Sequence, residues 1–398
     1  MRIGIDGGCL ANRRGFGRFA RQVVAALGDA GSDHEFVVFV DRPSLGGVAV
    51  PGGMETVAVD VSEAPSRAAS AGGRRRVRDM IAMGQAVAAS RLDLVYFPAS
   101  YSFFPVWNAG RVVVTMHDTL ALAHPEWVFP DWRGRVAWRA KEKAAALWAD
   151  RIVTVSEAAR RDLAAWFRLP ESRIRVVGEG PDAAFGPDAP PFESDTTLRK
   201  HGVEPGSRYL LYVGGLSPHK NLVRLIEAFA RGAGLDTRLI LVGDIADVFH
   251  THVPALREAV ARFGLGARAH FTGFVPDAEL VHLYRRAYAL VQPSLMEGFG
   301  LPPVEAMACG TPVLCSTAGS LPEVVGDAGR YFDPTDVSAM AKVIRTALAD
   351  PAARDRLARR ALERSKQFTW AAAARSLLDC FEELGPGRVP SPSLRRTA

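Results

Sequence analysis

The sequence lacks the features that define several protein classes. Its 398 residues contain no apolar stretch near the ~18 residues that span a bilayer. The four cysteines follow neither a metal-ligand nor a redox spacing, so we expect reduced, mostly buried thiols. No Asp-x-Asp motif occurs, and no motif for reading RNA or DNA accompanies the net charge of +6. We therefore expect no nucleic-acid partner, and a charge that suits an anionic small ligand or an acidic lipid surface.

The composition and the start of the chain indicate a cytoplasmic globular protein. Hydrophobic residues make up 48% and charged residues 23% of the sequence, the balance of a soluble globular protein. The opening residues 1–8 read as a short strand that enters a glycine turn, without the apolar stretch of a signal peptide.

Apolar strand patterns alternate with helical patterns along the chain, which predicts an α/β fold. The expected strands are Arg2–Ile5, Phe36–Val40, Leu94–Phe97, Val112–Met116, Ile152–Val155, Ile174–Val177, Tyr209–Val213, Leu239–Val242, Ala269–Phe271, Ala289–Gln292 and Pro312–Cys315. A helix is expected over Lys220–Arg231, where apolar residues fall on one face.

The length fits two domains, and a proline-rich linker at Gly186–Pro191 separates two halves of similar pattern. We predict two facing, doubly wound Rossmann-like domains, residues 1–186 and 205–370, with ligands at the carboxyl ends of both sheets and the active site in the interdomain cleft. A last helix at about 370–384 is expected to cross back to the first domain. The tail from Gly385 onward is expected to be disordered.

The basic stretch Ser62–Arg78 is interpreted as a solvated loop, with a mobile acceptor or membrane-surface loop as the alternative.

The strongest motif runs from Glu297 to Glu305. Glycines in Gly298-Phe299-Gly300-Leu301 let backbone N–H groups approach a ligand, and two prolines then open a helix whose N-terminus suits a phosphate. The two carboxylates that flank this turn can each accept hydrogen bonds from a pair of vicinal hydroxyls, one pair on a hexose and the other on a ribose. The alternative is that Glu297 caps a turn and Glu305 is a surface helix residue.

A second motif follows the strand Tyr209–Val213. Gly214 and Gly215 end the strand, and Lys220 comes at the start of the expected helix, where the helix macrodipole disfavours a cation. A bound diphosphate would explain a lysine there. The alternative is a surface lysine that extends into solvent.

Two motifs in the first domain point to the same kind of ligand. Arg14-Gly15-Phe16-Gly17-Arg18 opens the helix after the first strand and brings backbone amides and Arg18 to the cleft. His117-Asp118-Thr119 follows the strand Val112–Met116, at the end of the sheet where ligands bind in such folds. By position alone, a structural and a functional role for His117 are equally favoured.

Together these motifs resemble the family-4 retaining glycosyltransferases, which have the two-Rossmann-domain architecture called GT-B. The resemblance extends from Met1 to about Leu384. Its most specific segments are Phe271–Val275, Pro293–Pro302, Glu305–Val313 and Gly319–Val324.

The resemblance implies roles for individual residues. Glu297 and the amides of Phe299, Gly300 and Leu301 would bind the transferred sugar and phosphate, and Glu305 the ribose. Lys220 would stabilise the departing diphosphate, which Gly15–Gly17 would approach from the other domain. Gly273, Phe274 and Val275 would border the base, and His117 would lie near the donor sugar. Many relatives have an arginine where this sequence has Gly215, so Lys220 would carry more of the phosphate charge, or Arg18 would assist.

The implied reaction is metal-independent and cofactor-free transfer from a nucleoside-diphosphate sugar, with retention at the anomeric carbon and front-face attack. The protein would contribute mainly positioning and electrostatic stabilisation. His117-Asp118 and His124–Trp127 look most like the bacterial mannosyltransferase subgroup, which makes GDP-mannose the first donor to test. The acceptor stays open among a glycan, a lipid-linked sugar and a natural product. A nucleotide-sugar epimerase and a non-catalytic nucleotide-sugar-binding protein are the alternatives.

Peripheral association with the inner membrane face is a further hypothesis. The tryptophans of Trp127–Trp148 would face a lipid-linked acceptor or pack within the fold, and packing is slightly favoured.

Overall fold

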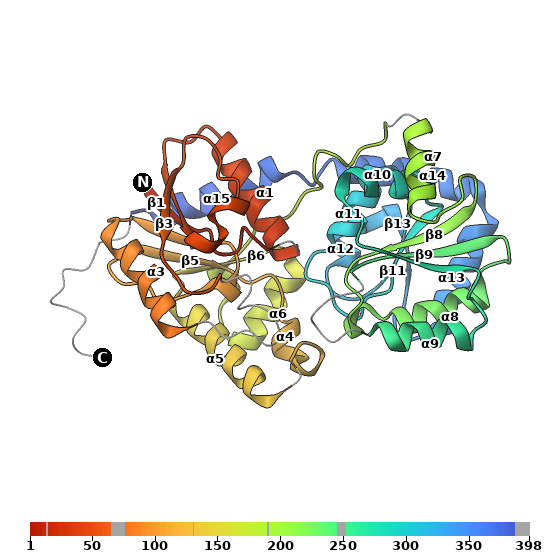
Figure 1. Cartoon of the computed structure of the whole chain (residues 1–398), viewed down its shortest axis with the longest axis horizontal. Helices are drawn as coiled ribbons and strands as arrows, with labels where there is room; N and C mark the ends of the chain where they lie inside the picture. The colour runs from red at the N-terminus through yellow and green to blue at the C-terminus, as the bar shows by residue number, and fades with distance from the viewer. Residues whose placement is uncertain (13–14, 65–75, 130, 189–190, 245–251, 387–398) are drawn as a thin grey trace. The chain divides into compact units, whose positions relative to one another are not determined.

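The computed structural model describes residues 1–12, 15–64, 76–129, 131–188, 191–244 and 252–386. These residues form two compact units (Figure 1). Unit 1 comprises residues 1–179 together with the C-terminal helix α15 (Trp370–Leu384). Unit 2 comprises Gly180–Thr369.

Unit 1 is built on a parallel sheet of seven strands in the order β3-β2-β1-β4-β5-β6-β7. The strands are β1 (Arg2–Asp6), β2 (Glu35–Asp41), β3 (Glu55–Val59), β4 (Leu94–Phe97), β5 (Arg111–Thr115), β6 (Arg151–Thr154) and β7 (Ile174–Val176). The helices are α1 (Gly15–Asp29), α3 (Val77–Ala89), α4 (Leu120–Ala123), α5 (Trp132–Trp148) and α6 (Glu157–Phe167), with short 3₁₀ turns η1 (Arg42–Gly47), η2 (Ser100–Ser102), η3 (Pro125–Trp127) and η4 (Glu171–Arg173). Helix α15 packs against α1.

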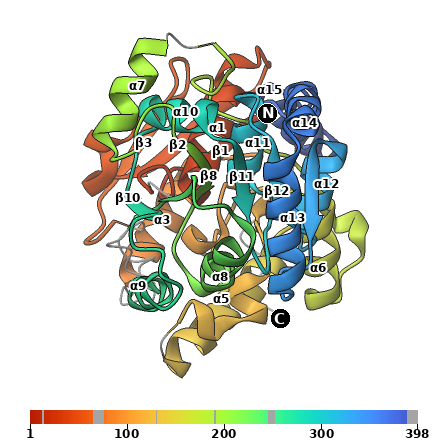
Figure 2. The same ribbon diagram turned by 90° about the vertical axis from the view of Figure 1, so that its right-hand side faces the viewer.

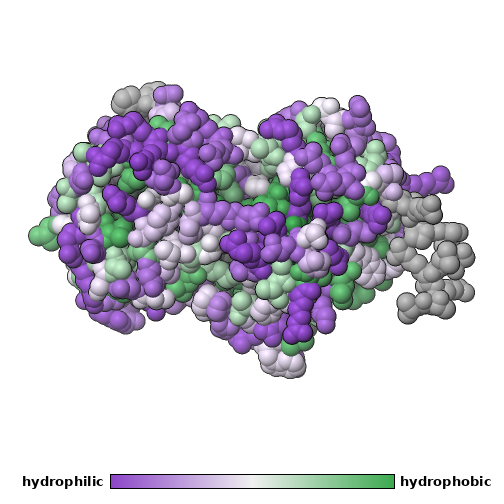
Figure 3. Space-filling view, turned by 180° about the vertical axis from the view of Figure 1, so that it is seen from behind, coloured by the Kyte–Doolittle hydropathy of each residue, from purple (hydrophilic) through white to green (hydrophobic). Residues whose placement is uncertain are grey.

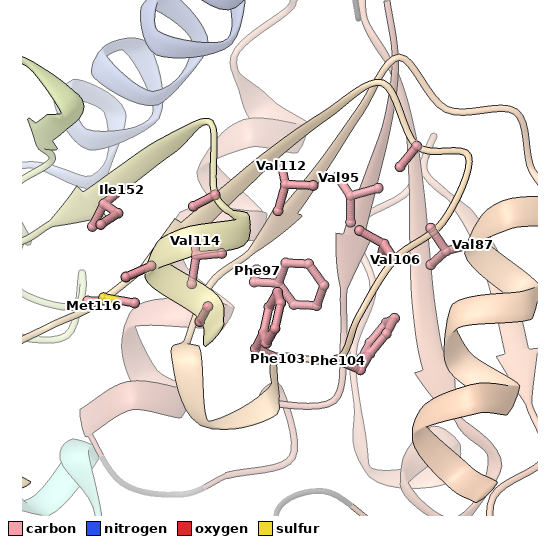
Figure 4. Packing of buried hydrophobic residues seen from close by; sticks show 14 of the residues in the cluster. Val87, Val95, Phe97, Phe103, Phe104, Val106, Val112, Val114, Met116 and Ile152 are labelled. Atoms are coloured by element: carbon pink, nitrogen blue, oxygen red, sulfur yellow. The ribbon is translucent and has the colours of Figure 1, made fainter. Parts of the chain in front are cut away.

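The core of unit 1 lies between this sheet and its helices. Four-residue strand β4 is buried along its whole length, as expected for a central strand of a parallel sheet. Phe97 at its end packs against Phe103 and Phe104, with ring centroids 5.1 and 5.0 Å apart (Figure 4). The aromatic cluster fixes the loop that leaves β4 and therefore the edge of the sheet where His117 lies.

Unit 2 repeats the same plan with a parallel sheet of six strands in the order β10-β9-β8-β11-β12-β13. The strands are β8 (Arg208–Val213), β9 (Thr237–Val242), β10 (Ala269–Gly273), β11 (Ala289–Gln292), β12 (Val313–Ser316) and β13 (Gly329–Phe332). Its helical elements are α7 (Pro191–Lys200), η5 (Pro218–Lys220), α8 (Leu222–Gly232), α9 (Val253–Arg262), α10 (Asp277–Arg286), α11 (Leu301–Ala308), α12 (Leu321–Val325), η6 (Gly326–Ala328), α13 (Val337–Ala349) and α14 (Pro351–Ser365). Helices α8, α9 and α13 cover one face of the sheet, and α10, α11 and α14 cover the other (Figure 2).

The structure differs from the sequence expectations in three places. Strands β3 and β13 were not expected; each lies at an edge of its sheet, and in each only the last residue is buried. Lys220 does not start an α-helix: it ends the 3₁₀ turn η5, and Asn221 with φ +60° separates it from α8. Lys220 therefore lies one residue before the N-cap of α8, still close to the positive end of the helix dipole.

Several expectations fall on residues outside the described ranges. These are residues 65–75 of the basic stretch, residues 189 and 190 of the linker, Arg14, and residues 387–398 of the tail. Among the described residues, no helix is long and apolar enough to cross a membrane. On the face shown in Figure 3, hydrophilic residues predominate and hydrophobic residues form small separate groups.

Candidate functional site

The predicted site residues follow the strands at which each sheet reverses its order, except for His117, which follows β5, and Gly273–Val275, which lie at the end of β10. In unit 1 this point lies between β1 and β4, and in unit 2 between β8 and β11. Ligands of doubly wound sheets bind outside the carboxyl ends of the strands at this point. The loop after β8 carries Lys220, and the loop after β11 carries Glu297. The topology therefore brings the two residues to one edge of the sheet.

Lys220 and Glu297 form a half-buried ion pair. Lys220 Nζ donates to Glu297 Oε1 over 2.7 Å, and the two side chains are 17% and 10% exposed. The same carboxylate oxygen accepts from Gln292 Nε2 and from the Ser294 hydroxyl, each at 2.7 Å. Three donors therefore hold one carboxylate oxygen of Glu297 and fix the side chain at the end of β11.

The surroundings of this pair control the protonation of two groups. Burial acts to raise the pKa of the Glu297 carboxyl, but the Lys220 ammonium and the Ser294 hydroxyl outweigh it and hold the pKa below its ordinary value. Burial, together with the nearby Lys220 charge, lowers the pKa of His219 to about 3. At neutral pH the Glu297 carboxyl is therefore ionised and the His219 imidazole is neutral.

Asn221 positions the turn that carries Lys220. Its side-chain amide donates to the carbonyl oxygens of Pro293 (3.0 Å) and Pro334 (2.7 Å), and its backbone lies in the left-handed region. Asparagine tolerates this conformation better than most residues. Asn221, Gln292 and Ser294 were not predicted from the sequence, although all three lie beside the glycine motifs at the ends of strands.

The loop that follows Glu297 presents unpaired backbone amides. The N–H groups of Phe299, Gly300 and Leu301 make no backbone hydrogen bond within the described parts of the chain. Because the next two residues are prolines, they supply no N–H groups to the first turn of α11. These three amides are therefore available to oxygen atoms of a ligand.

Gly319 lies directly against this loop. A Cβ atom on Gly319 would come within 2.4 Å of the Glu297 carbonyl oxygen, and its φ is +58°. Ser320 also donates to the loop, from its N–H to the Glu297 carbonyl (3.2 Å) and from its hydroxyl to the Phe299 carbonyl (2.7 Å). The loop position thus depends on the segment that precedes α12.

Glu305 is not a surface residue. It lies on α11, is 1% exposed, and its Oε2 accepts from the Tyr284 hydroxyl of α10 over 2.9 Å. A buried carboxylate needs such partners, and its burial argues against the surface-helix interpretation.

The predicted site glycines of unit 2 differ in whether the local structure requires a glycine. Gly214 has φ +149°, and a Cβ there would meet the Tyr212 hydroxyl at 2.8 Å, whereas Gly215 has room around it. Gly273 ends β10 with φ +75°. Phe274 beside it is 67% exposed, and Val275 is buried.

In unit 1, the residues 15–18 form the first turn of α1. Gly17 is buried so tightly that a Cβ would overlap the Asn12 carbonyl oxygen at 1.8 Å, whereas Gly15 has open space. Phe16 is exposed, and Arg18 is half-buried. Gly17 therefore has a packing role, whereas the sequence motif predicted only an approach to a ligand.

His117 is buried at the end of the sheet, after β5. Its ring lies 4.8 Å from the rings of both Phe16 and Phe19. Its Nε2 is 3.3 Å from the Pro98 carbonyl, so this nitrogen donates, and Nδ1 lies 3.8 Å from Glu179 Oε1. That separation exceeds a direct hydrogen bond but lies within the range of an ion pair.

Within the described ranges, no three His, Cys, Asp or Glu side chains are grouped as a metal centre would require. All four cysteines are buried and unpaired.

Solved structures share this fold over nearly the whole chain. A sucrose-phosphate synthase from Thermosynechococcus elongatus superposes with a TM-score of 0.75 at 22% identity, over 96% of this chain and 99% of that one. The Anabaena protein HepE, solved with UDP-glucose, superposes with a TM-score of 0.72 at 20% identity, over 96% and 100% of the two chains. With its two doubly wound parallel sheets, the protein has the GT-B fold of glycosyltransferases.

Sequence comparisons identify the family. Residues 13–185 match the model for "Glycosyltransferase Family 4", and residues 193–364 match that for "Glycosyl transferases group 1". The O-antigen chain mannosyltransferase B of Escherichia coli is 34% identical over 71% of this chain and 73% of its own length. The serotype-specific mannosyltransferase WbdA of Escherichia coli is 31% identical over 69% of this chain, which corresponds to 34% of that longer protein. The chain belongs to glycosyltransferase family 4, and it resembles the bacterial mannosyltransferases within it.

Proposed function

We propose that this glycosyltransferase transfers a mannosyl residue from GDP-mannose to a glycan, lipid-linked or small-molecule acceptor, with retention of anomeric configuration and without a metal ion. The names of the similar bacterial proteins support mannose as the sugar. The observation that carries the proposal is the half-buried Lys220–Glu297 pair beside the amides of Phe299, Gly300 and Leu301, which make no backbone hydrogen bond among the described residues.

In this proposal the donor occupies the edge of the unit 2 sheet. The diphosphate binds the Lys220 ammonium and the loop amides, which replace a divalent cation in neutralising the leaving group. The sugar hydroxyls bind Glu297, whose lowered pKa keeps it an ionised acceptor. The ribose hydroxyls bind Glu305, and the segment Gly273–Val275 borders the base. Gly214 and Gly215 allow the backbone to approach the phosphates.

The residues of unit 1 have proposed roles as well. His117 binds a hydroxyl of the donor sugar, and the segment Gly15–Arg18 assists at the diphosphate. Because no described nucleophile–base pair accompanies Glu297, we propose front-face attack, in which the departing phosphate oxygen accepts the acceptor proton.

The test is product analysis after incubation with GDP-mannose labelled at the anomeric carbon, with a lipid-linked mannoside acceptor and EDTA. We expect a new mannoside whose one-bond carbon–hydrogen coupling shows the α configuration of the donor. A sugar that is altered but still attached to the nucleotide would instead identify an epimerase. Tight donor binding without turnover against any acceptor would identify a non-catalytic binding protein.

A further inference from the structure

The outer face of α5 exposes an apolar ridge. Residues at a spacing of four lie in one row along a helix. The row that begins at Trp132 contains only apolar side chains, which are Trp132, Val136, Ala140, Ala144 and Trp148. Trp132 is 67% exposed, Val136 56%, Trp148 39%, and Leu147 beside the row 71%. Trp132 and Trp148, at the two ends of α5, are therefore exposed, contrary to the favoured sequence interpretation. Trp127 and Trp138 are half-buried and pack against the rings of His124 and Phe129, as that interpretation predicted.

Basic residues flank this ridge, and exposed acidic residues are missing from the helix. Arg133, Arg139 and Lys143 are exposed, and none of them forms an ion pair in the portion of the chain that is described. The only acidic residue of α5 is Glu142, which is buried. Asp131, just before the helix, accepts from the Gly134 N–H and caps the first turn. The exposed face of α5 is thus apolar along its centre and positive along its sides.

The opposite face of α5 borders the His117 region of unit 1. Lys141 donates to the Tyr101 carbonyl oxygen of η2, and the Glu142 carboxyl is buried near His117 and Asp118. Figure 1 shows α5 at the edge of unit 1, with one long side turned outward. One helix therefore connects an exposed surface with the proposed sugar-binding residues of this unit.

We propose that the outer face of α5, defined by Trp132, Arg133, Val136, Lys143 and Leu147, binds the surface of an anionic lipid bilayer. A helix with an apolar centre and basic flanks lies in the interface plane, with its apolar side chains among the acyl chains and its cations at anionic headgroups. Tryptophan is favoured at that depth because its ring is apolar and its N–H is polar. The inference rests on the proposed function in one respect: among the three proposed classes of acceptor, binding to a membrane favours the lipid-linked one.

The test is sedimentation of the full chain with vesicles, because it requires neither donor nor acceptor. We expect binding to vesicles of equal parts phosphatidylglycerol and phosphatidylcholine, weakened by salt, and none to pure phosphatidylcholine. Arg133→Gln with Lys143→Gln removes two surface charges, and at about fivefold per charge it lowers the partition coefficient about 25-fold. Val136→Ser with Leu147→Ser lowers it by at least about tenfold, since two apolar side chains are lost.

Matched controls lie on unit 2. Arg330→Gln with Lys342→Gln removes the same charge from exposed positions, and Leu235→Ser removes a leucine that is 89% exposed. Both controls should bind vesicles like the wild type. Absence of binding by the wild type, or equal losses in the α5 variants and the controls, would overturn the proposal. It would also be overturned if Leu147→Ser dissociated a dimer and left vesicle binding unchanged. Vesicle binding without sugar transfer would contradict only the proposed function.

Discussion

Replacing Gly319 by alanine tests whether the position of the Glu297 loop controls sugar transfer. The added Cβ would lie 2.4 Å from the Glu297 carbonyl oxygen and 2.9 Å from the Glu297 nitrogen. Since carbon–oxygen contacts begin at about 3.3 Å, the loop must move by roughly 0.9 Å. Because the loop holds Glu297 and the amides of Phe299, Gly300 and Leu301, its displacement misplaces the groups proposed to bind sugar and phosphate.

A misplacement of this size costs on the order of 100-fold in kcat/KM, or about 2.7 kcal/mol of transition-state stabilisation. The assay is initial-rate transfer from the donor, together with urea unfolding. The matched control is Gly264→Ala, because Gly264 has a similar φ of +65° with nothing near its Cβ position. Both variants should lose about 1–2 kcal/mol of stability to left-handed strain. Gly319→Ala should lose more stability because the loop must also move, and only Gly319→Ala should lose activity. Equal activity of the two variants would refute the reasoning.

Two other substitutions test the structure. Gly17→Ala should lower the free energy of unfolding by about 3 kcal/mol in urea titrations, because the added Cβ overlaps the Asn12 carbonyl oxygen. The control Gly15→Ala should change the free energy of unfolding by no more than about 1 kcal/mol. Equal effects of the two substitutions would contradict the packing role of Gly17. Glu297→Gln should lower the free energy of unfolding by about 3 kcal/mol at pH 7, since it leaves Lys220 without its carboxylate partner. The folded-state pKa of Glu297 is lowered, so the stability from its ionised form is present above the ordinary pKa of 4.5 and is lost as the pH falls through the folded value. The difference in free energy of unfolding between the wild type and Glu297→Gln should therefore become smaller below pH 4.5. The same difference in urea titrations at pH 7 and at pH 4 would contradict this.

The interior of both sheets was predictable because parallel strands covered on both faces are continuous apolar runs. β4 and β11 have the bounds that their apolar runs predict. β3 and β13 were not recognised, because each begins with two residues that are not apolar, Glu55-Thr56 and Gly329-Arg330, and keeps too short an apolar run. The break before α8 was also missed, because only the contacts of Asn221 with two distant carbonyls reveal its left-handed backbone.

The candidate site was predictable where glycine motifs follow strands, and less so where contacts are long-range. Lys220 and Glu297 are 77 positions apart, and only the parallel neighbours β8 and β11 bring them to one edge. Glu305 could be identified by its spacing from Glu297, but its partner Tyr284 comes from another helix. The close approach of Gly319 to Glu297 depends on the same tertiary packing, and no local pattern announces it.

Calorimetric titration with GDP and UDP, with and without EDTA, tests the donor site most directly. It is measured on the wild type and on Glu305→Gln, which keeps the size of the side chain and an acceptor for Tyr284. We expect GDP to bind in EDTA, and Glu305→Gln to weaken its binding by about 10- to 100-fold, because a charged hydrogen-bond acceptor is lost. Binding that requires a divalent metal, binding of neither nucleotide, or equal affinity of the variant would contradict the proposed donor site.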